Sequence, residues 1–404
     1  MRIVSIAWRT IRWSIASRGA ARGRTERAAV VLEVRSERGA VGLGEAAPLP
    51  GMSPDTLDDA ERAIAAFAQR APLELPDREA VYALAAATAA TASGIAMPAP
   101  ADRSVATPLP AAGSPAARFA IEAALLDALA RERGISLSAL LGSPSSGAPA
   151  IAGAAELRSG QAHGPTATAA GATGAMHRAG TVPLAAVVDD PDAARAAFAA
   201  GIRCLKIKLG ASDDPGRVFA IAEAAPGARL RIDANRTWPR AEVAARLAAL
   251  SALPIDYVEE PCHAAHLLLA EPLAGRLALD ESLAGLAPGE LHAALASPQL
   301  AALVLKPTLL GGLSAALGLA ELARRAGVAA ITSHGLEGPV GTAACAELAL
   351  ALGGDHPVGL AAHAALDGWL IDVPQLAPDH VHAALADGLG FADLDLAGVG
   401  LVAR

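Results

Sequence analysis

Charged side chains recur at the ends of short apolar runs in the second half of the chain, and two lysines open the series. Lys206 and Lys208 lie one residue apart in the run CLKIKLG. Because side chains alternate between the two faces of a strand, both ammonium groups point to the same face. The apolar residues beside them occupy both faces, which predicts a strand buried on both sides. Two neighbouring ammonium groups lower each other's pKa, so one becomes a usable base near neutral pH.

Three carboxylates end the next three apolar runs. Asp233, Glu259 and Asp280 end RLRID, IDYVE and RLALD, respectively. Carboxylates that converge repel one another unless a cation lies between them. Their hard oxygen atoms select Mg²⁺, Mn²⁺ or Ca²⁺ over zinc, and we expect Mg²⁺, with Mn²⁺ as a substitute. Lys306 ends the following run and is expected on the side of the metal opposite the lysine pair.

This set of groups suits the removal of a proton from the carbon next to a carboxylate. The metal and the far lysine would stabilise the enolate that forms. Each residue has a simpler explanation by itself, because paired lysines are usually solvated and an aspartate at a strand end often caps the next helix. Their shared position at the ends of consecutive runs favours the metal site with a lysine base.

The spacing of these residues predicts the architecture that positions them. The intervals run from 21 to 31 residues, the length of one βα unit, through Lys208, Asp233, Glu259, Asp280, Lys306 and Glu337. Seven or eight such units favour a barrel, whose active site lies at the carboxyl ends of the strands. No GxGxxG motif follows the first of these strands, which argues against a dinucleotide-binding sheet.

The first part of the chain has the pattern of an α+β domain. Residues 28–46 indicate two strands joined by a polar turn, and residues 53–70 and 114–134 indicate two helices, the first capped by Ser or Asp. Residues 84–113 are interpreted as a poor helix or loose linker, and residues 143–180 as a flexible insertion or linker.

Composition narrows the partners. The net charge of −8 argues against nucleic acid as a partner. The chain has no strongly apolar stretch of about 18 residues, so we expect no membrane span. The N-terminus lacks the pattern of a signal peptide and reads as a strand or hairpin. Cys204, Cys262 and Cys345 form no CxxC motif, so we expect no disulfide framework or zinc site and a cytoplasmic location. Oligomeric state is left open.

Five short motifs resemble those of the enolase superfamily. They are KIK at 206–208, DAN at 233–235, EEP at 259–261, DES at 280–282 and LKP at 305–307. More narrowly, they resemble the subgroup with lysines on both sides of the site, which includes muconate-lactonising enzymes. The resemblance implies an α/β fold, a (β/α)₇β TIM-like barrel with an α+β N-terminal capping domain completed by the C-terminal segment.

The resemblance also divides the chain. We expect the capping domain at 1–142, the low-complexity insertion or linker at 143–180 and the catalytic barrel at 181–370. The remaining segment, 371–404, is expected to return to the capping domain.

Within the subgroup, segments such as RIDANRTW, VLKPTLLGG and SHGLEGPVG look most like o-succinylbenzoate synthases. That likeness implies Mg²⁺-dependent syn-dehydration of a small carboxylate, 2-succinyl-6-hydroxy-2,4-cyclohexadiene-1-carboxylate, in menaquinone biosynthesis. It assigns the α-proton to Lys208, with support from Lys206, and stabilisation of the enolate to Lys306.

The likeness assigns further roles around the site. The metal ligands would be Asp233, Glu259 and Asp280. Ser333, the backbone of Gly359 and the loop 49–52, including Met52, would contact or cover the substrate. The residues that support the ligands would be Arg231, Asn235, Glu260 and Glu281.

Several alternatives stay open. The same site would serve an N-acylamino acid racemase or another cycloisomerase or epimerase. The last strand, GLAAHAAL, lacks the Asp-x-Asp with which dipeptide epimerases hold a substrate amine. A Schiff-base lyase using Lys306 would be independent of metal, and a non-catalytic binding barrel would be unaffected by a chelator.

His334 is interpreted as a pocket or structural histidine, with a base role as the minority option. His263, His266 and His356 are interpreted as surface residues.

Overall fold

The structure of the 404-residue chain is a computed structural model. It describes residues 1–17, 21, 23–75, 114–142, 180–213 and 215–399. The interpretations of residues 84–113 and 143–179 therefore lie outside the described residues. None of the helices in the described ranges is both long and apolar enough to cross a membrane.

An antiparallel sheet of four strands forms the centre of the N-terminal domain, in the order β3-β2-β1-β4. The predicted strand pair is confirmed, since β2 and β3 are joined by a tight turn. The predicted N-terminal strand is also present. The bounds are β1 (Arg2–Ser14), β2 (Glu26–Ser36), β3 (Val41–Ala46) and β4 (Leu73–Glu74).

Both predicted helices pack on this sheet, with a short third helix after them. Thr56, rather than the expected Ser or Asp, caps the first helix, because its side chain accepts from the Asp59 amide at 3.2 Å. The next helix approaches the sheet closely where glycine permits it: a Cβ on Gly44 would lie 1.9 Å from the Ala120 carbonyl oxygen. The bounds are α1 (Leu57–Ala68), α3 (Pro115–Glu132) and α4 (Leu137–Gly142).

The second half of the chain forms a parallel barrel, as predicted. Seven strands follow one another in the order β12-β11-β10-β9-β8-β7-β6. Bridges from Val358 to Leu184 and from Gly359 to Ser333 supply an eighth position that joins the two ends of the sheet. The bounds are β6 (Ala185–Val187), β7 (Cys204–Lys208), β8 (Arg229–Asp233), β9 (Ile255–Glu259), β10 (Leu277–Leu279), β11 (Leu300–Leu305) and β12 (Ala329–Thr332).

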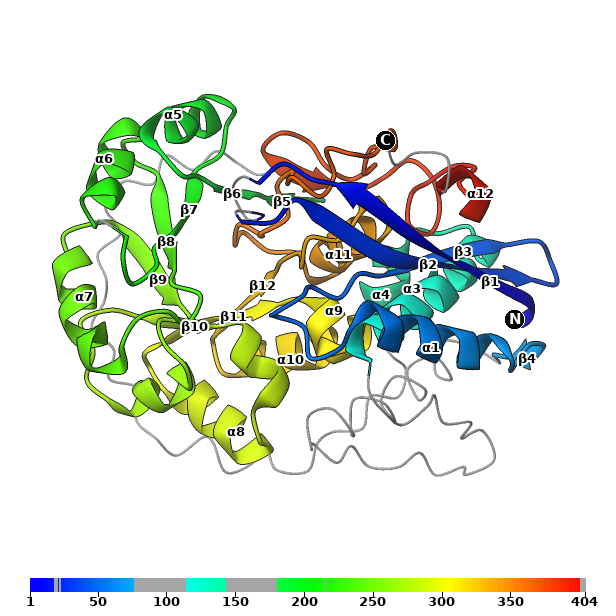
Figure 1. The fold of residues 1–404 in the computed structure, drawn as a ribbon, viewed down its shortest axis with the longest axis horizontal. Coiled ribbons are helices and arrows are strands. Elements are labelled where there is room, and N and C mark those ends of the chain that lie inside the picture. The colour runs from blue at the N-terminus through cyan, green and yellow to red at the C-terminus, as the bar shows by residue number, and fades with distance from the viewer. Residues whose placement is uncertain (18–20, 22, 76–113, 143–179, 214, 400–404) are drawn as a thin grey trace.

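Helices surround the barrel strands, and those between residues 191 and 296 form an arc on the side away from the capping domain (Figure 1). The connection between β9 and β10 differs from the predicted helix, since it holds only the 3₁₀ helix η5 (Ala265–Ala270). Two further 3₁₀ helices are η4 (Arg240–Glu242) and η6 (Glu281–Gly285). The α-helices are α5 (Pro191–Ala199), α6 (Gly216–Ala224), α7 (Val243–Leu250), α8 (Pro288–Ala296), α9 (Pro307–Leu310), α10 (Leu313–Arg325) and α11 (Pro339–Leu352).

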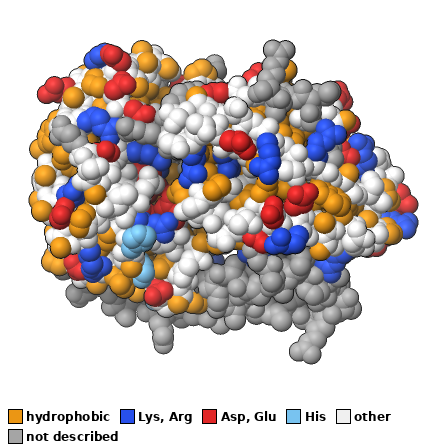
Figure 2. Space-filling model, in the orientation of Figure 1, with side chains coloured by type: hydrophobic (Ala, Val, Ile, Leu, Met, Phe, Trp, Pro, Cys, Tyr) orange, Lys and Arg blue, Asp and Glu red, His pale blue; other side chains and the backbone are white. Residues whose placement is uncertain are grey.

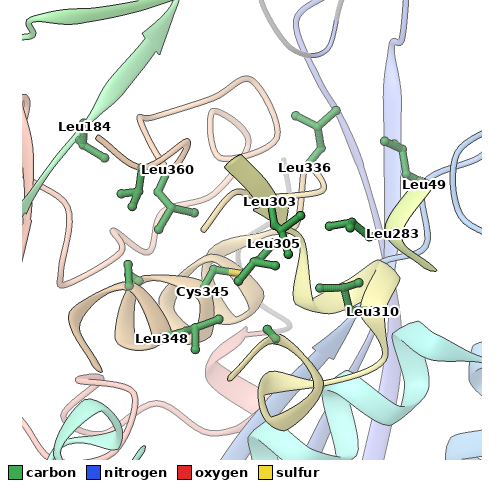
Figure 3. Close-up of a cluster of buried hydrophobic side chains, with 14 of the residues drawn as sticks. Leu49, Leu184, Leu283, Leu303, Leu305, Leu310, Leu336, Cys345, Leu348 and Leu360 are labelled. Carbon is green, nitrogen blue, oxygen red and sulfur yellow. The ribbon is translucent and has the colours of Figure 1, made fainter. Parts of the chain in front are cut away.

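One apolar core extends from the barrel into the capping domain. Leu303 and Leu305 of β11, Cys345 of α11 and Leu49 of a capping-domain loop belong to the same buried cluster (Figure 3). All three cysteines are buried and free. On the face in Figure 2, Lys and Arg side chains alternate with Asp and Glu side chains rather than forming one charged patch.

The C-terminal segment contacts both domains. Its strand β13 (His380–His382) pairs with β5 (Thr181–Pro183), and its helix α12 (Leu396–Val399) lies against β1 and β2. Asp127 of α3 accepts hydrogen bonds from the Leu43 and Leu389 amides at 2.9 and 2.8 Å. The capping-domain helix thus binds its own sheet and the returning segment with one carboxylate.

Two buried glutamates of the capping domain accept hydrogen bonds at the first turns of barrel helices. Glu45 accepts from the Gly338 and Gly341 amides at 2.5 and 2.8 Å, at the start of α11. Glu122 accepts from the Ser314 amide at 2.8 Å, at the start of α10. Burial raises the pKa of each carboxyl to about 7. Through these hydrogen bonds, the positive N-terminal ends of the two barrel helices hold the capping domain against the barrel.

Glu122→Gln is expected to change how stability depends on pH. The folded pKa of about 7 exceeds the ordinary value of 4.5, so the folded state binds this proton more tightly than the unfolded state. Stability from Glu122 is then lost as pH rises from about 5 through 7. The variant stays neutral and gains up to about 3 kcal/mol over wild type at pH 8, with little gain at pH 5.

Urea denaturation of both proteins at pH 5 and pH 8 measures this difference. The exposed Glu223 supplies a matched control, since Glu223→Gln removes a carboxylate that is in water in both states. If wild type and Glu122→Gln lose stability in parallel over this range, Glu122 is not the group that titrates.

Candidate active site

A cavity of about 140 Å³ opens at the carboxyl ends of the barrel strands, below a loop of the capping domain. Of the residues that the sequence analysis assigned to catalysis, metal binding, ligand support or substrate contact, three do not line it: Asp280, Glu260 and Glu281. The others do, and they are Met52, Lys206, Lys208, Arg231, Asp233, Asn235, Glu259, Lys306, Ser333 and Gly359. The barrel thus brings together side chains from strands far apart in sequence.

Lys206 lies between two carboxylates. Its Nζ is 2.9 Å from Asp233 Oδ2 and 2.8 Å from Glu259 Oε1. Burial lowers the pKa of Lys206, but Asp233, Glu259 and Asp280 outweigh burial and raise it well above its ordinary value. The expectation that the paired lysines lower each other's pKa is therefore wrong for Lys206.

Lys208 behaves as that expectation states. It is the last residue of β7 and pairs in register with Asp233 of β8. Burial is the largest cause that lowers its pKa, and the ammonium groups of Lys206 and Lys306 add to the effect. Of the two lysines on β7, Lys208 is the one that a proton leaves more readily.

Lys306 follows β11 on the other side of the cavity. It forms an ion pair with Asp280, and its Nζ lies 3.5 Å from Glu281 Oε1. Although burial opposes it, the two carboxylates raise the pKa of Lys306. This side chain is a stable buried cation, with 8% of its surface exposed.

The three carboxylates at the strand ends fit a divalent cation in their chemistry. Asp233, Glu259 and Asp280 are 3%, 1% and 4% exposed. Burial, Glu281 and Glu259 raise the pKa of Asp280 well above its ordinary value, which is the crowding that a cation relieves.

The arrangement nevertheless shows that repulsion between the three carboxylates is not sufficient evidence for a metal ion. Lys206 and Lys306 already supply positive charge to these carboxylates, so their approach does not by itself require a metal. Within the described ranges, no three His, Cys, Asp or Glu side chains are grouped so as to hold a metal ion. Metal binding here would require the ammonium groups to turn away from the carboxylates.

Glu260 holds the turn that carries Asp280. It accepts from the Asp280 amide at 2.8 Å and from the Ser282 amide and hydroxyl at 3.0 and 2.7 Å. Its φ of 42° is positive, and Asn235 shares this feature with a φ of 44°. Backbone strain of this kind clusters at functional sites.

Arg231 of β8 and Asn235, which follows that strand, support the site. The Asn235 amide donates to Asp233 Oδ1 at 3.0 Å, which fixes that carboxylate. Arg231 donates to the Pro357 carbonyl at 2.7 Å and lies over the Tyr257 ring, 5.0 Å from its centroid. Arg231 therefore connects β8 to the segment that closes the barrel.

Sequence reasoning missed Arg27, a buried residue of β2. Its guanidinium donates to the carbonyls of Ala47 and Pro48 at 2.8 and 3.0 Å, and to that of Leu336 at 2.8 Å. It therefore joins the capping-domain loop that carries Met52 to the barrel loop after β12. The sequence carries no signal for this contact, because its partners are main-chain atoms about 20 and 309 residues away.

Sequence reasoning also missed His363, which lines the cavity. Its ring stacks on that of His334, with centroids 3.9 Å apart and planes at 29°. Its position in the sequence could have indicated a site residue, because His363 comes shortly after Gly359 at the carboxyl end of the eighth strand position. His334 lies in the pocket, in agreement with the main interpretation. His263 and His356 are exposed as expected, whereas His266 is half-buried.

Comparisons with known proteins agree with this architecture. Residues 4–142 match the family described as "Mandelate racemase / muconate lactonizing enzyme, N-terminal domain", and residues 189–393 match "Enolase C-terminal domain-like". The chain is 34% identical over 186 residues to o-succinylbenzoate synthases of Yersinia pseudotuberculosis and Yersinia pestis. That alignment covers 42% of this chain and 56% of each relative, so it spans little more than half of their length.

Similar solved structures include enzymes with other reactions. A dipeptide epimerase from Methylococcus capsulatus, complexed with Mg and the dipeptide L-Arg-D-Lys, is 25% identical, with a TM-score of 0.70 over 96% of this chain and 99% of that one. A muconate lactonizing enzyme, 22% identical with a TM-score of 0.71 over 100% of both chains, shares the fold.

Arg27→Gln is expected to destabilise the protein by about 2–4 kcal/mol. The change removes guanidinium donors from buried carbonyl groups and takes a nearby positive charge away from the buried carboxylates of Glu45 and Glu337. Arg12→Gln is the matched control, because its ion pair with Glu26 at 3.5 Å is exposed and contributes at most about 1 kcal/mol. Urea denaturation measures both variants, and equal losses would contradict the role given to Arg27.

Proposed function

Because this chain belongs to the enolase superfamily, we propose that it removes a proton from the carbon next to a substrate carboxylate, with Lys208 as the base. The observation that supports this most is the placement of lysines on both sides of one cavity. Lys208 ends β7, and Lys306 follows β11. A substrate carbon between them meets a base on one side and a fixed cation on the other.

The proposed metal ligands are Asp233, Glu259 and Asp280, with Mg²⁺ as the ion and Mn²⁺ as a substitute. When bound, the ion would stabilise the negative charge that develops on the substrate carboxylate. Glu260 and Asn235 hold the ligand-bearing turns through the Asp280 amide and Asp233 Oδ1. These contacts are backbone-based and do not depend on what occupies the cavity.

The lysines divide the proton chemistry. Lys208 has the lowered pKa that a base needs, because burial disfavours its charged form. Lys306 has a raised pKa and stays an ammonium that stabilises the enolate. For a syn-dehydration, Lys208 takes the α-proton and then gives it to the hydroxyl that departs from the same face, so water leaves and Lys208 returns to its neutral form.

We favour the dehydration of 2-succinyl-6-hydroxy-2,4-cyclohexadiene-1-carboxylate to o-succinylbenzoate. The Yersinia o-succinylbenzoate synthases support this substrate, although they match over part of their length. The cavity suits it, because apolar side chains such as Leu49 and Ile331 surround the charged groups and offer a surface to the ring. Ser333 and Gly359 line the cavity where the succinyl arm would extend.

Racemisation of N-acylamino acids is the second candidate. Lysines on opposite sides of one carbon are what a racemase needs, and the Methylococcus capsulatus neighbour is an epimerase. A dipeptide substrate is disfavoured, since residues 359–363, GLAAH, offer no carboxylate for its ammonium group. A Schiff-base lyase is disfavoured too, because the nucleophile would be Lys306, which is held as a protonated ion pair with Asp280.

The first test is an ultraviolet assay with purified protein, Mg²⁺ and the cyclohexadiene substrate, with and without EDTA. We expect rapid loss of the diene absorbance that EDTA abolishes and that Lys208→Ala lowers by about 10³-fold or more. Near wild-type kcat in a folded Lys208→Ala variant would refute the base. No turnover by folded wild type would refute the dehydratase and favour the racemase, which α-proton exchange in D₂O detects.

Asp280→Asn is expected to weaken Mg²⁺ binding by about tenfold or more, because one of three anionic ligands is lost. Isothermal titration calorimetry of Mg²⁺ with both proteins measures the change without any turnover. Asp355→Asn alters an exposed carboxylate on the loop after α11 and serves as the control. Equal Mg²⁺ affinity in Asp280→Asn and wild type would remove Asp280 from the ligand set.

A further inference from the structure

We propose that His334 determines specificity for the far end of the substrate: its Nε2–H donates a hydrogen bond to the terminal carboxylate of the acyl arm. This inference rests on the proposed function, because it takes the reacting end to lie at the lysines. It gives His334 a binding role that differs from that of a base.

The backbone of His334 is fixed by the strand pairing that closes the barrel. Its amide donates to the Gly359 carbonyl at 3.3 Å, next to the bridge between Ser333 and Gly359. The side chain is 9% exposed and lines the cavity. A ring held in this way presents its free edge in one direction without a large entropic cost on binding.

The hydrogen bond on the inner edge of the ring defines the tautomer. Nδ1 accepts from the Leu336 amide at 3.2 Å, so in a neutral imidazole the proton is on Nε2. Burial, the neighbouring His363 and the lysines lower the pKa of His334 well below its ordinary value, which keeps the ring neutral. Among the hydrogen bonds of the described residues, none uses Nε2 of His334.

His363 supports the ring of His334 from the side. The two rings stack with centroids 3.9 Å apart, an arrangement that two imidazolium ions would not share. His363 Nε2 lies 3.4 Å from Thr342 Oγ1. Two residues on, the Ala365 carbonyl accepts from Trp13 Nε1 at 2.8 Å, so the capping domain anchors this segment.

Apolar side chains make up most of the immediate surroundings of His334, although Lys306 follows the neighbouring strand. We define the histidine wall as Leu336, Ala361, Ala362 and Ala364 together with His334 and His363. Ser333 lies beside it, but its hydroxyl donates to the Gly359 carbonyl at 3.2 Å. An acceptor oxygen that reaches Nε2 of His334 therefore meets a side-chain donor, with apolar groups around the hydrogen bond that strengthen it.

Calorimetric binding of two ligands in the presence of Mg²⁺ tests the inference. 2-Succinylbenzoate carries the terminal carboxylate, and 2-butanoylbenzoate has a methyl group in its place. His334→Phe keeps a stacking ring but removes the donor, and we expect it to weaken 2-succinylbenzoate by about 10- to 100-fold and leave 2-butanoylbenzoate unchanged. His334→Gln keeps an N–H donor and should recover part of the affinity. His263→Gln, at an exposed position, is the control.

Equal losses for both ligands would overturn the inference, since His334 would then only shape the cavity. Unchanged binding of 2-succinylbenzoate by His334→Phe would overturn it as well. If wild type binds neither benzoate, the dehydratase substrate fails, and N-succinylphenylglycine and N-butanoylphenylglycine repeat the same comparison. A wild-type protein that binds neither pair would refute the inference together with both proposed substrates.

Discussion

The balance of buried charge at the carboxyl ends of the barrel strands is the constraint on which the site depends. A buried carboxylate or ammonium is costly unless it is paired. Lys206 meets this requirement for Asp233 and Glu259, and Lys306 meets it for Asp280. The pairing raises the pKa of Lys206 and of Lys306 and so keeps both as ammonium groups, and it leaves Lys208, whose pKa is lowered, as the lysine suited to give up a proton.

The capping domain obeys the same rule at its contact with the barrel. Glu45 and Glu122 are buried, and each accepts amide hydrogen bonds at the start of a barrel helix. Arg27 lies near Glu45 and donates to the main chain of both domains. Because Leu49 and Met52 of the capping domain line the same cavity as the barrel strand ends, these contacts set the distance between the loop that carries Met52 and those strand ends.

The features that could be predicted from the sequence are those that follow from the regular spacing of strands and helices. Strand ends spaced by one βα unit led to the barrel and to Lys208, Asp233 and Glu259, all of which line one cavity. It could not give the raised pKa of Lys206, because that depends on which oxygens the side chain reaches across two further strands. The role of Arg27 could not be predicted for a similar reason. It donates to main-chain carbonyl groups, which every residue has, so its partners leave no pattern in the sequence.

The proposed function assigns reaction and recognition to different groups of one cavity. In that proposal the lysines and carboxylates act on the carbon beside a carboxylate, and dehydration and racemisation share that first step. The choice between them therefore depends on where the rest of the substrate is held, which places the hydroxyl near Lys208 or the second face of the carbon near Lys306. His334 follows β12, the strand beside the one that Lys306 follows, in a segment fixed by Gly359, and is suited to set that position. Selectivity in this cavity then arises from neutral hydrogen-bond donors in apolar surroundings, where a lost hydrogen bond is costly.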